Sequence, residues 1–440
     1  KAVTVAGCTL SGAQAGNYTV TQPTGLTANI TPKALTVTGL TANNKVYDAT
    51  TAVSLSGTAA LLGAETPGSG STSDGKPYTG DTVSVGGTAT GTVGDRHVGS
   101  NKAVTVAGCA LSGAQAGNYT VTQPTGLTAN ITPKALTVTG LTANNKVYDA
   151  TTAVSLSGTA ALLGAEDPGT GSTSDGKPYT GDAVSVGGTA TGAVGDRHVG
   201  SNKAVTVAGC ALSGAQAGNY TVTQPTGLTA NITPKALTVT GLTANNKVYD
   251  ATTAVSLSGT AALLGAETPG SGSTSDGKPY TGDTVSVGGT ATGTVGDRHV
   301  GSNKAVTVTG CTLSGAQAGN YTVTQPTGLT ANITPKALTV TGLTANNKVY
   351  DATTAVSLSG TAALLGAEGP GTGSTSDGKP YTGDTVSVGG TATGAVGDRH
   401  VGSNKAVTVA GCTLSGAQAG NYTVTQPTGL TANITPKALT

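Results

Sequence analysis

The most reactive side chains in this sequence belong to five cysteines that recur at a fixed interval of 101 residues. Each stands in the frame V-T-V-(A/T)-G-C-(T/A)-L-S-G: Cys8, Cys109, Cys210, Cys311 and Cys412. One thiol per interval cannot form a disulfide within its own unit, and metal sites need clustered Cys and His. Two interpretations stay open. We favour a buried, reduced thiol, and the alternative is an intermolecular disulfide in an oxidising compartment.

A histidine recurs in the sequence G-D-R-H-V-G, between charged neighbours that suggest acid–base chemistry. The four copies are His97, His198, His299 and His400. A catalytic pair or a metal ligand would need a third converging group, and no nucleophile or second histidine lies nearby in the sequence. We therefore expect a loop residue beside a local ion pair.

The segment Asn43–Asp48 brings amide, amine and carboxylate groups together in every unit. Clustered Asp and Asn can bind calcium, but the spacing differs from an EF-hand loop and carboxylates are few. A Lys–Asn isopeptide bond would need the lysine, the asparagine and an acid to be buried together. The interpretation we favour is structural: Tyr47 packs and Asp48 caps a turn. We expect no metal and no cofactor.

Two N-x-T sequons per unit are potential glycosylation sites. They are Asn17, Asn29, Asn118, Asn130, Asn219, Asn231, Asn320, Asn332, Asn421 and Asn433. Threonine-rich strands generate this triplet by chance, so we favour unmodified asparagines.

All these residues recur because the chain is a tandem array. The complete units are 33–133, 134–234, 235–335 and 336–436, preceded by the partial unit 1–32 and followed by 437–440. A unit of about 100 residues can bury its own core, unlike the shorter repeats of solenoids. Because the sequence starts and stops inside units, we expect a segment of a longer protein.

The composition excludes several classes of function. Only 10% of residues are charged, the formal net charge is +1, and Phe, Trp and Met are absent. Such a chain has no basic patch for nucleic acid or an anionic membrane, and no apolar run long enough for a membrane helix. It also lacks the high net charge of disordered chains.

Short segments that alternate between apolar and polar residues must position the recurring side chains of each unit. Leu35 and Val37 alternate with threonines, and Gly108 shifts the phase so that Cys109 and Leu111 share an inward face. The Gly/Ser/Pro-rich stretch 58–80 predicts an exposed loop, beginning with a strand or a short helical turn. Seven or eight short strands per unit predict an all-β fold of antiparallel β-sandwiches, Ig-like or β-grasp-like. The short Pro-containing links predict a rod.

Three blocks of each unit resemble the YDG-type repeats of filamentous-haemagglutinin-like, two-partner-secreted bacterial adhesins. They are NNKVYDATT at Asn43–Thr51, DRHVGSNKAVTV at Asp95–Val106, and LSGAQAGNYTVTQPTGLTANITPKALTV at Leu111–Val138. The chain departs from that pattern at Ala49, where the family usually has Gly, and at Cys109, where Leu is common. A position that accepts Leu is a core position, which favours the buried thiol.

The resemblance implies an extracellular, cell-surface or secreted protein whose repeats act as a stalk or spacer, without catalytic residues. We therefore predict a structural protein and not an enzyme. The alternative is lateral or end-to-end self-assembly into a filament, sheath or biofilm matrix, through unpaired strand edges. Glycan binding by each repeat ranks last, because only Tyr47, Tyr78 and Tyr119 offer aromatic surfaces. Host or matrix glycans or proteins would be bound through regions outside this sequence.

Overall fold

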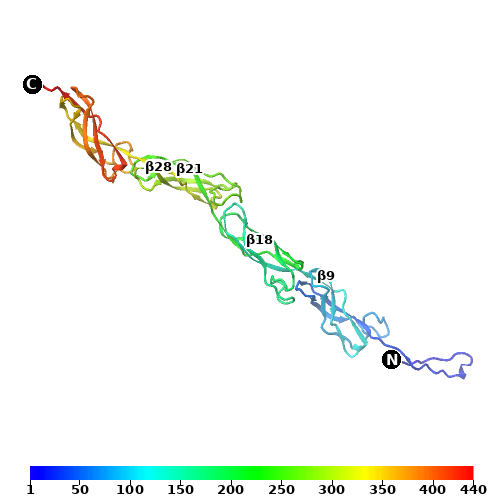
Figure 1. Cartoon of the computed structure of the whole chain (residues 1–440). Helices are drawn as coiled ribbons and strands as arrows, with labels where there is room; N and C mark the ends of the chain where they lie inside the picture. Colours follow the sequence, from blue (N-terminus) through cyan, green and yellow to red (C-terminus); the bar gives the residue numbers. More distant parts are fainter. Residues whose placement is uncertain (440) are drawn as a thin grey trace. The chain divides into compact units, whose positions relative to one another are not determined.

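The computed structural model describes residues 1–439, and these form four tandem repeats of curled β-sheets (Figure 1). The only helical elements among them are three-residue 3-10 turns: η1 (Ala15–Asn17), η2 (Ala116–Asn118), η3 (Ala217–Asn219), η4 (Ala318–Asn320) and η5 (Ala419–Asn421). No helix within 1–439 has the length and apolarity needed to cross a membrane. The all-β prediction is therefore confirmed.

Each repeat contains strands in the same order. The N-terminal segment holds β1 (Ala2–Val3) and β2 (Leu26–Thr27). The first repeat holds β3 (Lys33–Ala42), β4 (Lys45–Val46), β5 (Ala52–Val53), β6 (Leu55–Leu61), β7 (Ser84–Gly86), β8 (Thr90–Val93), β9 (Gly99–Ala107), β10 (Ala110–Ser112), β11 (Tyr119–Thr122) and β12 (Thr128–Thr132). The second holds β13 (Lys134–Ala143), β14 (Lys146–Val147), β15 (Ala153–Val154), β16 (Leu156–Leu162), β17 (Ser185–Val194), β18 (Gly200–Ser213), β19 (Tyr220–Thr223) and β20 (Thr229–Thr233). The third holds β21 (Lys235–Ala244), β22 (Lys247–Val248), β23 (Ala254–Val255), β24 (Leu257–Leu263), β25 (Ser286–Val295), β26 (Gly301–Ser314), β27 (Tyr321–Thr324) and β28 (Thr330–Thr334). The fourth holds β29 (Lys336–Ala345), β30 (Lys348–Val349), β31 (Ala355–Val356), β32 (Leu358–Leu364), β33 (Ser387–Val396), β34 (Gly402–Ser415), β35 (Tyr422–Thr425) and β36 (Thr431–Thr435).

The chain divides into two compact units. The first comprises Lys1–Asn144, Ala153–Gly195 and Ala204–Thr229. The second comprises Asn145–Thr152, Asp196–Lys203 and the residues from Ala230 on. The segments 145–152 and 196–203 therefore belong with the third repeat, although they lie in the second repeat by sequence.

Two sheets make up the second, third and fourth repeats, as the third repeat illustrates, and the first repeat has a further two-stranded sheet of β10 and β7. The three-stranded sheet has the order β24-β21-β27, and the five-stranded sheet has the order β22-β28-β26-β25-β23. The pairs β21–β27 and β22–β28 are parallel, and the others in these sheets are antiparallel. The expectation of purely antiparallel sheets is wrong for these two pairs. A parallel pair needs a long crossover connection, which alternation along single strands does not reveal.

The core of each repeat lies between its two sheets. In the fourth repeat, Val340 of β29 packs with Val409 and Cys412 of β34. Strand β34 keeps Val407 and Val409 buried, and then Gly411, with a φ of +91°, shifts the phase so that Cys412 is also buried. The predicted phase change at this glycine is confirmed. It corresponds to a β-bulge, where one extra residue turns the following side chains inward.

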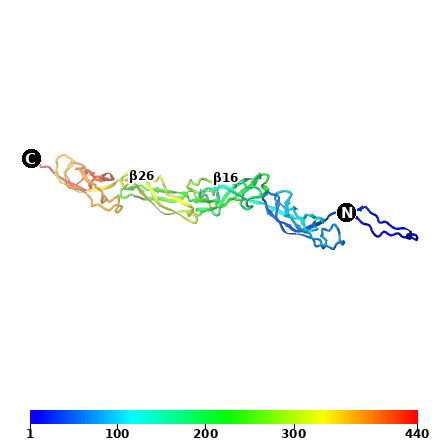
Figure 2. The same ribbon diagram turned by 90° about the horizontal axis from the view of Figure 1, so that it is seen from below.

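The stretch 58–80 begins with a strand, one of the two predicted alternatives, and its loop is closed by a bridge that its composition does not reveal. Strand β6 continues through Leu61, and Glu65 forms an isolated parallel bridge with Tyr78. The equivalent strand of the second repeat, β16, is labelled in Figure 2. In the second repeat the equivalent Tyr179 is 2% exposed. Residues 66–73 are exposed, as are Gly63, Ala64, Thr79 and Gly80, whereas Gly75 and Pro77 are buried. The loop is therefore solvated over most of its length and is held by the Glu65–Tyr78 bridge.

Gly241 lies at the register shift between β21 and β24, where the two strands approach closely, and it provides a test of this packing. A Cβ added at Gly241 (φ +84°) would lie 2.2 Å from Thr260 O. We expect alanine at this position in all four repeats to destabilise each repeat by about 1–3 kcal/mol, from backbone strain and displacement of the neighbouring strand. The substituted glycines are Gly39, Gly140, Gly241 and Gly342.

Calorimetry of the 440-residue chain measures this effect as a lowered melting temperature. The matched control places alanine at glycines that have open space around the added Cβ and no left-handed φ: Gly63, Gly164, Gly265 and Gly366. Equal melting temperatures for the two variants would contradict the expectation.

Candidate functional site: the joint between successive repeats

Tyr47 is positioned by the last strand of its own repeat. Strand β4 pairs in parallel with β12, and the Tyr47 amide donates to Thr132 O over 2.8 Å. Two residues later, Ala49 adopts a left-handed φ of 60°. Glycine adopts this conformation at no steric cost, which explains why glycine is usual here in the resembled repeats.

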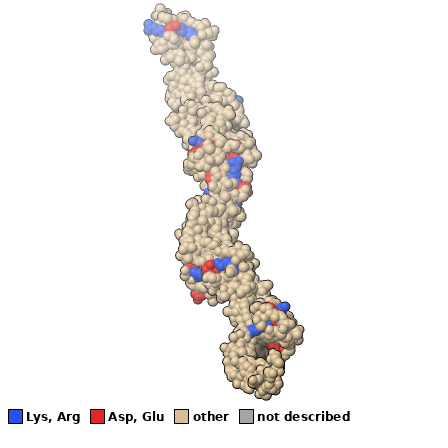
Figure 3. All heavy atoms as spheres, turned by 90° about the vertical axis from the view of Figure 1, so that its right-hand side faces the viewer, with Lys and Arg blue, Asp and Glu red and all other residues tan. Residues whose placement is uncertain are grey.

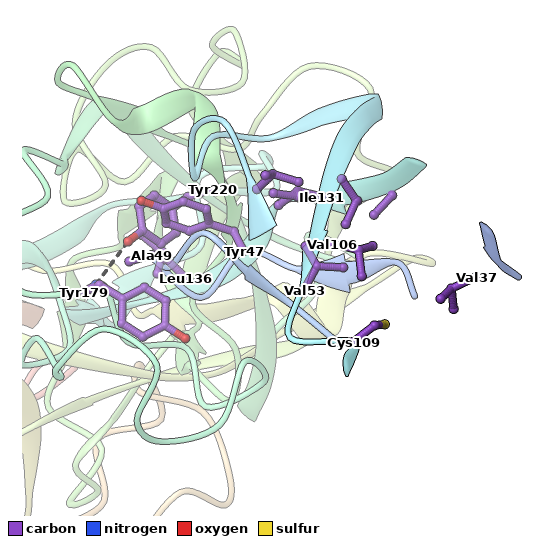
Figure 4. Close-up of a cluster of buried hydrophobic side chains, with 13 residues drawn as sticks. Val37, Tyr47, Ala49, Val53, Val106, Cys109, Ile131, Leu136, Tyr179 and Tyr220 are labelled. Carbon is purple, nitrogen blue, oxygen red and sulfur yellow. Dashed lines mark hydrogen bonds between the residues drawn. The ribbon is translucent and has the colours of Figure 1, made fainter. Parts of the chain in front are cut away.

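The Tyr47 ring is wholly buried, and part of the surface that covers it belongs to the next repeat. It makes edge-to-face contacts with Tyr179 and Tyr220, with ring centroids 6.0 and 5.2 Å away (Figure 4). Such aromatic pairs stabilise beyond the area that they bury. The Tyr179 amide donates to the Tyr220 hydroxyl over 3.0 Å, so the receiving pair is itself held together.

Asp182 of the second repeat lies at the centre of a polar network in this joint. Its side chain has no exposed surface, and its Oδ2 accepts from the hydroxyls of Tyr47 at 2.8 Å and Tyr220 at 2.5 Å. Its Oδ1 accepts from Arg96 Nη2 of the first repeat at 2.7 Å. Burial is the larger cause and the hydrogen bond to Asp182 the smaller one, and both raise the pKa of the two tyrosine hydroxyls well above their usual range. Both hydroxyls therefore remain donors, and the buried carboxylate is compensated.

Backbone contacts surround this network. The Gly169 amide donates to Asp48 O over 2.9 Å, and the Val98 amide donates to Asn219 Oδ1 over 3.1 Å. Asn219 Nδ2 lies 3.0 Å from His97 Nδ1, within hydrogen-bond distance. Successive repeats are thus connected through rings, charges and backbone groups together.

The second unit contains the same joint twice. In one copy Tyr148, Arg197 and His198 meet Tyr280, Asp283, Asn320 and Tyr321. In the other copy Tyr249, Arg298 and His299 meet Tyr381, Asp384, Asn421 and Tyr422. In the fourth repeat no following repeat is described, and Val349 and Val401 are 55% and 49% exposed. The burial of this face therefore depends on the neighbouring repeat.

A second buried polar group lies inside each repeat. Lys134 Nζ has no exposed surface, contacts Glu166 Oε1, lies 3.0 Å from Asp175 Oδ1 and sits 4.1 Å from the centroid of the Tyr179 ring. Burial lowers the pKa of Lys134, but the hydrogen bonds to the two carboxylates outweigh it and the net shift is upward. Burial by itself would raise the pKa of Asp175. The hydrogen bonds from the Lys177 amide and from Lys134 outweigh this effect and lower the pKa to about 2. Lys134, Glu166 and Asp175 therefore form a buried ion-pair group.

The predicted sites lie at separate places in each repeat. Cys109, Cys210, Cys311 and Cys412 are buried thiols, and Cys8 is exposed. The backbone on either side of Cys210 is fixed by Gln224, whose Oε1 accepts from Cys210 N while its Nε2 donates to Cys210 O. No group of three or more metal-binding side chains occurs within residues 1–439.

Thiol accessibility gives a direct prediction. With the folded chain, we expect one thiol, that of Cys8, to react rapidly with a thiol-specific reagent, and the four others to react only after denaturation. Replacing Cys8 by serine should remove the fast phase, because the remaining thiols are buried. Rapid reaction of more than one thiol in the native protein would contradict this expectation.

The remaining predicted residues have structural partners. His97 Nδ1 contacts Asn219, and its amide donates to Asp95, which pairs with Lys102 at 2.6 Å. Arg96 pairs across the joint with Asp182, so the expected local ion pair involves Lys102 instead.

The Asn43–Asp48 segment forms a turn. Lys45 Nζ donates to Asp48 Oδ1, to Thr50 O and to Ala52 O, and the Thr50 amide donates to Asp48. Asp48 caps the turn and Tyr47 packs, as predicted. The hydrogen bonds of the Lys45 amine in this turn go to Asp48, Thr50 and Ala52 and not to an asparagine, so the turn does not assemble the groups that a Lys–Asn isopeptide bond needs.

The sequons fall into groups of different accessibility. Asn17, Asn29 and Asn118 are exposed, and Asn130, Asn231, Asn332 and Asn433 are half-buried. Asn219, Asn320 and Asn421 are buried in the joints. A glycan on any of these last three would require the joint to open.

Charged side chains gather in small groups separated by wide uncharged areas on the face shown in Figure 3. Many of the acids and bases pair with each other, as at the joint and in the lysine group. Two of the three tyrosines considered for glycan binding, Tyr47 and Tyr119, are buried. Because these two rings are buried, the three tyrosines offer little aromatic surface to a sugar ring.

Sequence reasoning missed the main residues of the joint. Tyr179 lies in the stretch predicted to be an exposed loop, and Arg96 lies where a local ion pair is predicted. The only signal in the sequence is that a Tyr stands beside an Asp, as at Tyr47 and Asp48, in every unit. Periodicity places a side chain on a face, but it does not reveal contacts between repeats.

Comparison with known proteins gives one family. The sequence profile described as the YDG domain matches four segments: 31–126, 132–227, 233–328 and 334–429. No curated protein matches the chain.

Proposed function

Since the chain belongs to the YDG domain family, we propose that its repeats form the stalk or spacer of a large, filamentous-haemagglutinin-like bacterial surface adhesin. The protein is extracellular, at the cell surface or secreted through a two-partner system, and it has no enzymatic role. Each repeat acts as an Ig-like β-sandwich module, and the modules join into a rod. A binding region outside this sequence contacts the host or matrix glycan or protein.

The joint is the observation that carries this proposal. A flexible linker would separate neighbouring domains by Gly/Ser-rich chain. Here Tyr47, Arg96 and His97 instead contact Tyr179, Asp182 and Asn219 of the next repeat. Because such contacts hold each module against its neighbour, a stalk built from them resists bending. Short links with a proline, such as Ile131–Lys134, add stiffness.

Electron microscopy of the 440-residue protein tests this function. We expect single particles of uniform contour and uniform end-to-end length at low concentration. Tyr148→Ala should broaden the distribution of bending angles, since it removes the ring at one joint. Tyr350→Ala is the matched control, because this tyrosine has no neighbouring repeat in the described chain. Wild-type particles with freely variable bends would contradict a stiff stalk.

Lateral self-assembly is the second proposed function. Strands β24 and β27 are the edges of the three-stranded sheet, and unpaired edges can add another strand. The few charged groups on the face in Figure 3 leave little repulsion between copies. Light scattering at increasing concentration separates the two proposals: a constant monomer mass favours the stalk, and ordered bundles favour the filament or matrix.

Glycan binding by the repeats ranks third, and a glycan array tests it.

A further inference from the structure

Each repeat places a lysine amine between two carboxylates in a site with little access to water. Lys134 Nζ contacts Glu166 Oε1 and Asp175 Oδ1, beneath the ring of Tyr179. The same group recurs as Lys33, Glu65 and Asp74; Lys235, Glu267 and Asp276; and Lys336, Glu368 and Asp377. The amine is thus held against two carboxyl groups at once.

We propose that Lys134 and Asp175 join in an intramolecular isopeptide bond, with Glu166 as the proton carrier, and that the equivalent residues do so in the other repeats. The bond forms once, after folding, without an added enzyme or cofactor.

Asp175 is the electrophile because its carboxylate is polarised. Its Oδ1 accepts from Lys134 Nζ and also from the Lys177 amide, over 3.0 Å. A fixed N–H donor that points at a carboxyl oxygen stabilises the negative charge that develops there during attack by an amine. The Asp175 side chain is also the more exposed of the two acids, at 22% against 11%, so a released water molecule has a path to solvent.

Glu166 is held where a proton carrier must lie. The Glu166 amide donates to Pro178 O, and Glu166 O accepts from the Thr180 amide. A Cβ at Gly171 would lie 2.0 Å from Glu166 Oε2, so only glycine allows the loop to pass so close to this carboxylate. The acid is thereby fixed in contact with the amine.

The reaction balances without an oxidant or another reactant. The Lys134 ammonium passes a proton to the Glu166 carboxylate, which delivers it to the Asp175 carboxylate, and the neutral Nζ then attacks Cγ of the uncharged Asp175 carboxyl group. The Nζ–Cγ bond forms and one Cγ–O bond breaks. The departing oxygen leaves as water, with the proton that Glu166 delivered and a second lost by the amine. Glu166 ends as a carboxylate, and a lysine–aspartate amide replaces the ion pair.

Geometry favours this reaction, and charge makes it slow. The Nζ–Oδ1 distances of 2.8 to 3.0 Å in the four repeats hold the amine in contact with the carboxyl group that it attacks. Fixed neighbouring groups react as if at effective concentrations of about 10⁵–10⁸ M. The resting ion pair must first neutralise, so the bond forms slowly and accumulates with time. Once formed, it allows tension to pass from residue 134 to 175 without extending β13–β16.

The mass of the denatured 440-residue protein tests the proposal. We expect a mass below that of the plain sequence by one water for each bond, hence by four waters at completion. Fragmentation of a protease digest should place each loss on a peptide pair that links the lysine and the aspartate, such as Lys134 with Asp175. An undiminished mass of folded, aged protein would overturn the proposal.

Single substitutions use the other repeats as internal controls. Asp175→Ala should reduce the deficit by one water, and Glu166→Gln should prevent the same bond while leaving the Lys134–Asp175 contact. The matched control is Asp196→Ala, which removes an exposed ion pair with Lys203 and should leave the full deficit. Circular dichroism checks that each variant folds, and the three unchanged repeats report within the same molecule. A deficit that Asp175→Ala does not change would also overturn the proposal.

Discussion

Asp182→Ala is expected to lower the free energy of unfolding by about 3–5 kcal/mol, the usual cost of removing one partner from a buried ion pair. The substitution leaves the hydroxyls of Tyr47 and Tyr220 without their acceptor and Arg96 without its carboxylate. The two hydroxyls stay buried at the joint without a hydrogen-bond acceptor, and leaving buried donors unsatisfied lowers the stability of the folded state. Denaturant unfolding of the 440-residue protein, followed by circular dichroism, measures the loss.

Asp81 provides the matched control for this substitution. In the first repeat it accepts from the Tyr119 hydroxyl at 2.5 Å, but no arginine or tyrosine of another repeat reaches it among the described hydrogen bonds. Asp81→Ala should therefore cost about 1–3 kcal/mol, as expected for one unsatisfied buried group. Equal losses for the two variants would show that the contacts across the joint contribute no stability. Asp182→Asn keeps an acceptor and should fall between them.

Tyr249→Ala is expected to have an effect of similar size, about 3–5 kcal/mol, because it removes a wholly buried aromatic ring. The cavity lies between Tyr381 and Tyr422, which lose their edge-to-face partner. The hydroxyl that donates to Asp384 is lost as well. The sequence contains 13 tyrosines and no tryptophan, so intrinsic tyrosine fluorescence during unfolding reports the change directly.

Tyr350→Ala is the corresponding control in the fourth repeat. This residue occupies the same turn, and its amide donates to Thr435 O as Tyr249 donates to Thr334 O. Its ring is only half-buried, and Val349 beside it is exposed. We expect a loss well below that of Tyr249→Ala. A loss as large as at Tyr249 would mean that the ring stabilises its own repeat and not the joint.

These two predictions also distinguish a chain of coupled repeats from a chain of independent ones. In a linear array, stability is the sum of repeat terms and nearest-neighbour terms. The joint substitutions change the neighbour term, whereas Gly241→Ala changes the repeat itself. If the joint variants separate one broad transition into two, the joint contributes the cooperativity.

The sequence by itself determined the repeat, the strands and much of the core. The 101-residue period places each cysteine at the same position of its unit. The alternation of residues such as Leu35 and Val37 with polar residues predicts which face of the strand is buried. Gly108 predicts the phase change that buries Cys109. These features are local, since they depend on a residue and its neighbours a few positions away.

The tertiary structure alone decided which distant groups meet. Tyr47 and Asp182 are 135 positions apart, and Lys134 and Glu166 are 32 apart across a loop that composition marks as exposed. The parallel pairing of β21 with β27 likewise joins the two ends of a repeat. A polar side chain in a Gly/Ser-rich stretch looks the same in sequence whether it is solvated or buried. Its partners are fixed only when the sheets close and the next repeat packs against them.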